Sequence, residues 1–162
     1  MTLPRGRRPL PVPAVMFVLA ACVASPSVAA SCVTVHATDG ALLGAYPVGP
    51  LDTSVALSYV HSVTRTPVHE RYRLDGATLV QTELRFQDHG PGLPTQPAAG
   101  ESFAQEGEAF VLRMARPVDG IRARVDAAQL PRLAVGGAEV DLAQWGSRAI
   151  RLAALPGHCP ER

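Results

Sequence analysis

Apolar and polar residues alternate in short runs along the chain after residue 30. The clearest runs carry apolar side chains at alternate positions from Val55 to Val63 and again from Val68 to Leu74, a period typical of half-buried strands. Glycine, proline and aspartate separate the runs and indicate turns. The pattern predicts an all-β fold, which we expect to be a single-domain antiparallel β-sandwich or β-barrel with about eight to ten short strands.

The predicted strands differ in length, and one short helical turn is expected near residues 126–130 or 142–145. Gly136 and Gly137 favour a compact hairpin, because glycine accepts the positive φ angles that such turns require. The strands are expected at residues 32–37, 42–47, 54–63, 68–74, 78–87, 109–116, 121–125, 133–135, 138–142 and 149–155.

The two clearest strands should form one hairpin. A two-residue turn at 64–65 would place His61 opposite Val68 and Tyr59 opposite Glu70, all on one face. A slip by one residue would turn charged side chains into this face, so burial should hold the register. Glu70 then lies diagonally across from His61, within reach of a long side chain, and we expect a buried hydrogen-bonded pair.

The same face should continue into a third strand. A three-residue loop at 75–77 would place Val80, Thr82, Leu84 and Phe86 opposite the preceding strand. Other partners remain open for the carboxylate of Glu70, which burial would make costly if it stayed unpaired. These alternatives are Arg113, Arg116 and Arg122.

The longest stretch without periodicity runs from Gln87 to Glu106. Its beginning is rich in glycine and proline, which together fix unusual φ angles, so we expect a shaped surface turn there and a mobile tail at 95–107. Gly90, Gly92 and Pro94 are candidate partner-binding residues in this turn.

The first thirty residues resemble a secretory signal. Three arginines precede an apolar stretch at 15–24, which is too short to span a membrane. The small residues at 28–30 fit cleavage before Ser31, which would leave residues 31–162 as a single exported domain. Alternatively, the lipobox-like segment ending at Cys22 would make that cysteine a lipid attachment site.

Export also bears on the remaining cysteines, Cys32 and Cys159. An oxidising compartment favours a disulfide between them, with two free thiols as the alternative. The histidines and cysteines lack the spacing of metal ligands, so we expect no metal and no cofactor. Fifteen basic residues and fourteen acidic ones give a net charge of +1. A chain so close to neutral lacks the basic surface typical of nucleic-acid-binding proteins, so we expect no nucleic-acid partner.

Several of these residues together resemble the bacterial family called domain of unknown function 1850. The resemblance covers the chain from Cys32 to about Ala153 and departs from the family at Pro91, where a small residue would be expected. The residues that carry it are Tyr59-Val60-His61-Ser62-Val63, Pro67-Val68 with Glu70, and Phe86 with Gly90-Pro91-Gly92-Leu93-Pro94. Family members are commonly encoded beside tripartite ATP-independent periplasmic (TRAP) transporters of the TAXI type. The resemblance implies an exported accessory role and brings no catalytic residues.

Three functions are therefore considered. The first is a periplasmic binding protein that contacts the membrane or solute-binding subunits of a TRAP transporter. The second is a hydrolase with His61 as base and Glu70 as its orienting partner, although Ser62 should point to the opposite face from His61 and is a poor nucleophile. The third is a structural lipoprotein attached to the membrane through Cys22 alone. The candidate binding residues are Tyr59, His61, Ser62, Glu70, Gly90, Gly92 and Pro94, and the alternative reading is a polar pair buried in the core.

Overall fold

The computed structural model describes residues 31–161, so the predicted signal segment and Cys22 lie outside the described residues. The described chain forms eleven strands and two short 3-10 turns. In order they are β1 (Ser31–Ala37), β2 (Leu42–Val48), β3 (Ser54–Val60), β4 (Pro67–Asp75), β5 (Thr78–Phe86), β6 (Ser102–Glu106), β7 (Ala109–Val118), β8 (Ile121–Val125), η1 (Ala127–Gln129), β9 (Arg132–Val135), β10 (Ala138–Asp141), η2 (Leu142–Trp145) and β11 (Arg148–Pro156).

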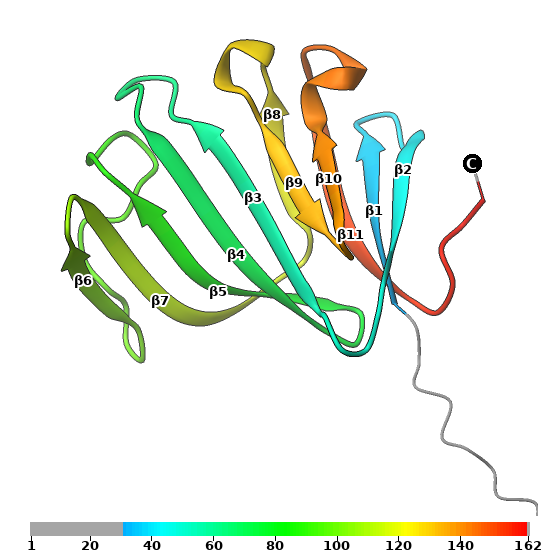
Figure 1. Ribbon diagram of the computed structural model, residues 1–162, viewed down its shortest axis with the longest axis horizontal. Helices are drawn as coiled ribbons and strands as arrows, with labels where there is room; N and C mark the ends of the chain where they lie inside the picture. Colours follow the sequence, from blue (N-terminus) through cyan, green and yellow to red (C-terminus); the bar gives the residue numbers. More distant parts are fainter. Residues whose placement is uncertain (1–30, 162) are drawn as a thin grey trace, which may run out of the picture.

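The strands build two antiparallel sheets. One has the order β2-β1-β11-β8, and the other has the order β10-β9-β3-β4-β5-β7-β6. The smaller sheet lies behind the β9–β10 side of the larger one, while β5, β7 and β6 extend away from it (Figure 1). The predicted all-β antiparallel sandwich is confirmed. No helix within residues 31–161 has the length and apolar character needed to cross a membrane.

The core has two parts. The larger part fills the space between the two sheets and includes Val33, Leu133 and Leu152, which are fully buried. The smaller part lies on β4, β5 and β7, where Val68 and Phe86 are buried and Leu93 of the segment after β5 packs against them. The expected shaped turn is therefore anchored by an apolar side chain.

Most strand predictions are confirmed. One short helical turn was expected at either of two places, and the structure has a 3-10 turn at both of them. The hairpin at Gly136 and Gly137 is also confirmed, since β9 and β10 pair directly across it. The strand β6 was not predicted, because its sequence was assigned to a mobile tail. Phe103 is the only large apolar residue of β6, and the strand lies at the edge of its sheet. Its sequence therefore lacks the alternation of apolar and polar residues from which the other strands were predicted.

The predicted register of the first hairpin is wrong by two residues. Tyr59 faces Val68 and Leu57 faces Glu70, so β3 ends before His61. A longer loop replaces the expected two-residue turn: the His61 N–H donates to the Thr66 carbonyl at 2.9 Å. Because side chains alternate with period two, a shift of two residues keeps every side chain on its face. Burial therefore could not distinguish the two registers.

The predicted pairing of β4 with β5 is also corrected. A two-residue turn joins them, with Asp75 facing Thr78, and the register shifts near Thr82. Such a bulge adds one residue to a strand and reverses which side chains face inward. Leu79 lies in the core opposite Leu74, and Gln81 points inward opposite Tyr72, the position expected for Val80.

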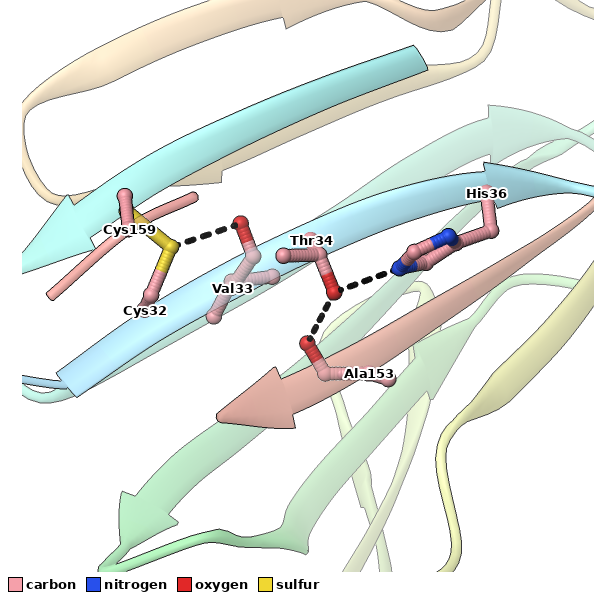
Figure 2. The surroundings of a disulfide bond; sticks show 6 residues. All are labelled: Cys32, Val33, Thr34, His36, Ala153 and Cys159. Atoms are coloured by element: carbon pink, nitrogen blue, oxygen red, sulfur yellow. Dashed lines mark hydrogen bonds between the residues drawn. A yellow bond between two sulfur atoms is a disulfide. The ribbon is translucent and has the colours of Figure 1, made fainter. Parts of the chain in front are cut away.

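The expected disulfide is confirmed between Cys32 on β1 and Cys159 near the carboxyl end, with an S–S distance of 2.00 Å (Figure 2). Beside it, the buried Thr34 hydroxyl lies 3.3 Å from the Ala153 carbonyl and 3.0 Å from His36 Nε2. The bridge thus fixes the chain's last described residues to the first strand of the smaller sheet.

Candidate functional site

A cluster of polar side chains lies on the inner face of the larger sheet, around the carboxylate of Glu70. Tyr59 on β3 donates its hydroxyl to Glu70 Oε1 at 3.0 Å. Tyr72 donates its hydroxyl to Oε2, and Gln81 Nε2 donates to the same oxygen at 3.3 Å. Three neutral donors from three neighbouring strands therefore hold one carboxylate in a fixed position.

The local sequence explains how this cluster forms. Glu70 lies two residues from both Val68 and Tyr72 on β4, so all three share the inner face. Tyr59 occupies the same face on β3, next to Val68. The bulge in β5 turns Gln81 toward the carboxylate. The alternating pattern places two of the donors, and the bulge adds the third.

The charge of Glu70 has no counter-ion in the part of the chain that the structure describes. None of the ion pairs among residues 31–161 includes Glu70. Arg113 pairs with Glu83 and Glu106, and Arg116 pairs with Glu101. Two of the three arginines considered as partners are therefore engaged elsewhere. The third, Arg122, lines the same groove as Glu70 without forming an ion pair with it. The carboxylate therefore accepts hydrogen bonds but forms no ion pair with a described residue.

The two tyrosines remain protonated donors well above neutral pH. Burial raises the pKa of Tyr59 and of Tyr72 above the usual value, and the nearby charge of Glu70 raises both further. A phenolate next to a carboxylate would place two negative charges in one partly buried site. The cluster thus offers a single negative charge with a fixed position and orientation.

A groove of about 380 Å³ opens between this cluster and the β8 edge of the smaller sheet. Its volume lies within the range of ligand sites, which is about 300–1,000 Å³. One wall consists of the polar cluster with Leu57, and the other consists of β8. The remaining lining residues come from the segment that follows β8 and from η2: Gln129, Pro131 and Leu142.

His61 belongs to a different contact, between the β3–β4 loop and the segment after β5. Its Nδ1 accepts the backbone N–H groups of Val63 at 3.3 Å and Thr64 at 3.2 Å. That assigns the proton to Nε2, which donates to the Pro91 carbonyl at 3.2 Å. His61 is only 8% exposed, so it acts here as a buried link between two loops.

Gly90 is required at this contact by close approach. A Cβ atom added to Gly90 would lie 2.6 Å from His61 Cε1 and 2.9 Å from Thr64 Cγ2. The turn is held on its other side by His89, whose ring lies 4.4 Å from that of Phe110. The glycine and proline pattern therefore serves the packing of this turn against its neighbours.

The candidate residues from the sequence thus fall into separate places. Tyr59 and Glu70 lie together in the groove, whereas His61 and Gly90 form the loop contact. Ser62 and Gly92 are exposed, and Pro94 is half-buried. The expected hydrogen-bonded pair of His61 and Glu70 is not formed, because the register shift moves His61 out of β3. The base and orienting partner of the hydrolase hypothesis therefore do not meet.

Sequence reasoning missed three parts of the groove. Tyr72 was placed on the inner face, but its hydroxyl was not assigned to Glu70. Gln81 was placed outside, since nothing in the apolar pattern marks the bulge. The edge position of β8 depends on the strand order of the sheet, which the sequence does not display.

Charged side chains on the outer face of the larger sheet form ion pairs, unlike Glu70 on the inner face. Arg71 and Arg113 both contact Glu83, and Arg85 and Arg113 both contact Glu106. Exposed ion pairs of this kind contribute about 0–1 kcal/mol each. They make the outer face a solvated surface with its charges largely compensated, unlike the groove.

Comparison with known proteins supports the resemblance seen in the sequence. The model of the family described as "Domain of unknown function (DUF1850)" matches residues 55–142, a span that runs from β3 to the start of η2 and contains the Glu70 cluster and β8. No curated protein and no solved structure gave a match. The family match covers more than half of the chain, and the protein therefore belongs to the DUF1850 family.

Proposed function

We propose that this chain is an exported binding protein that serves a TRAP-type periplasmic solute uptake system. The signal-like first thirty residues support export, and the bridge between Cys32 and Cys159 supports an oxidising compartment. The resemblance to a family commonly encoded beside TRAP transporters supplies the partner, which would be a membrane subunit or the solute-binding subunit.

The binding site of this proposal is the groove at Glu70. The observation that carries it is a partly buried carboxylate that three neutral donors hold in place and no described basic side chain neutralises. Leaving a charge unpaired in a partly buried site is costly. A bound partner with a positive group would recover that cost, so the arrangement favours binding.

A pull-down of the exported protein from a native membrane and periplasmic fraction tests this proposal. The wild type is compared with Glu70→Gln, which removes the charge at nearly constant volume. The matched control is Glu139→Gln, which makes the same chemical change at an exposed position on β10. Unfolding curves for all three proteins establish that each is folded.

We expect the wild type and Glu139→Gln to retain a transporter subunit and Glu70→Gln to lose it. Capture of no transporter subunit by the wild type would refute the association. Equal capture by Glu70→Gln would refute the groove as the site. The lipobox-like segment ending at Cys22 would allow a lipid anchor, and an anchored protein could still perform this binding role. Labelling with a fatty acid distinguishes an anchored form from a released one.

A further inference from the structure

The wall of the groove opposite Glu70 is the free edge of a strand. β8 lies at the end of the smaller sheet, and among the described strands it pairs only with β11. All five of its residues, Ile121–Val125, line the groove. Side chains of a strand point alternately to its two faces, so a groove that contacts every residue in turn lies along the backbone edge.

A free strand edge presents N–H and C=O groups that can pair with another extended chain. The backbone hydrogen bonds of residues 31–161 outside the paired strands include none from β8. A chain added beside β8 would extend the smaller sheet by one strand, over the inner face of the larger sheet. It would then lie between β8 and the Glu70 cluster.

We propose that the groove binds an extended peptide segment of a partner protein, which pairs with β8 as a fifth strand and places an arginine or lysine side chain on Glu70. The inference deepens the proposed function and rests on it, because it takes the same groove as the binding site. It adds the chemistry of the partner segment and the way that segment is held.

The basic residue follows from the charge of the site. Glu70 forms no ion pair with a described residue, and the hydroxyls of two tyrosines donate to its carboxylate. An arginine or lysine group gains a charge-assisted hydrogen bond from the carboxylate. An acidic residue at this position of the peptide would be repelled.

The flanking residues of the peptide follow from β8 itself. Ile121, Ala123 and Val125 belong to the core side, whereas Arg122 and Arg124 are exposed on the other face. Directly opposed residues of neighbouring strands interact, and opposite charges stabilise the pair. The bound segment should therefore alternate acidic residues beside the two arginines with basic or apolar residues facing the groove.

The same arginines disfavour a second copy of this chain as the occupant. Antiparallel pairing of β8 with the β8 of another molecule would bring Arg122 and Arg124 against the same two arginines. Like charges directly opposite each other destabilise a strand pair. The charge pattern of the edge thus selects a segment of different sequence.

The test uses the whole exported protein and two heptapeptides of identical composition. The probe Thr-Val-Glu-Arg-Glu-Val-Thr places arginine toward Glu70 and both glutamates toward the arginines of β8. The control Thr-Glu-Val-Arg-Val-Glu-Thr places both glutamates on the same side as the arginine, facing Glu70. Calorimetry measures binding, and hydrogen exchange of Ile121–Val125 reports whether the strand edge becomes protected.

We expect the probe to bind at least about tenfold more tightly than the control, and Glu70→Gln to weaken probe binding by at least about tenfold, as loss of a charged hydrogen bond predicts. Glu139→Gln should leave binding unchanged. Bound probe should slow exchange in β8.

Absence of probe binding would overturn the inference, as would binding without protection of β8 or without dependence on Glu70. If arginine methyl ester bound as tightly as the probe peptide, the ligand of the groove would be a small organic cation and not a peptide segment. A dimer of the free protein in solution that slows exchange in β8 would assign the edge to a second copy. Transporter capture that depends on Glu70, combined with no peptide binding, would keep the proposed function and remove only the strand addition.

Discussion

Removing the bridge between Cys32 and Cys159 should destabilise the protein by about 5 kcal/mol. The two cysteines lie 127 positions apart in the sequence, so the bridge closes a loop that contains nearly all of the described chain. It limits the conformations that this chain can adopt when it is unfolded. In the chain-entropy model a loop of this length reduces the entropy of the unfolded state enough to contribute about 5 kcal/mol at 25 °C. A domain is typically stable by about 5–15 kcal/mol, so the loss would be a large share of the total.

The assay is urea unfolding of the oxidised protein and of the double variant Cys32→Ala/Cys159→Ala, with Cys22→Ala in both so that no third thiol interferes. The same oxidised protein after reduction is the second comparison. Cys32 is fully buried, and alanine there removes a sulfur without adding a polar group. A loss below about 1 kcal/mol in both comparisons would refute the entropic argument, since the chain-entropy model gives about 5 kcal/mol for a loop of this length. A loss near the expected size would mean that the fold depends on an oxidising compartment.

Two further predictions concern the loop contact and the polar cluster. Gly90→Ala should lower the free energy of unfolding by about 1–3 kcal/mol, because the added Cβ overlaps the ring of His61. The control Gly49→Ala adds a Cβ that meets nothing within 4 Å, so the free energy of unfolding should change little. Equal effects of the two substitutions would contradict the packing argument. Burial and the charge of Glu70 raise the pKa of Tyr72, so above about pH 10, the unperturbed pKa, the unfolded state loses this proton first. The stabilisation from this proton should therefore be fully present below pH 10 and be lost as the pH rises further. In denaturant titrations at pH 8 and pH 11, the free energy of unfolding should fall less for Tyr72→Phe than for the wild type. Equal falls in the two proteins would contradict the assignment.

The fold class and the strand positions could be read from the sequence because both depend on local pattern. Alternation with period two marks a half-buried strand wherever one face is apolar, as it is in β3, β4 and β7. Glycine pairs mark turns for an equally local reason. β6 shows the limit, since an exposed edge strand needs little apolar sequence and is held by pairing with β7.

The candidate site could be predicted only in part, because its geometry depends on register. Glu70 and Tyr59 were placed on the inner face correctly, since a shift by two residues preserves faces. The partner of Glu70 was wrong for the same reason, because the shift changes neighbours. The inward turn of Gln81 depends on a bulge, and a bulge is decided by contacts with both neighbouring strands.

Glu70 joins two properties that usually exclude each other, and their combination favours binding over a purely structural role. Its hydrogen bonds are complete enough to keep a partly buried carboxylate in the folded protein. It forms no ion pair within residues 31–161, although ion pairs join three arginines to acidic residues on the outer face of the same sheet. A residue needed only to fix strand register would be as well served by a neutral amide. A fixed anion beside a free strand edge instead gives a partner both backbone pairing and a charge to meet, and because the tyrosines already hold the carboxylate in place, binding would order little of the site.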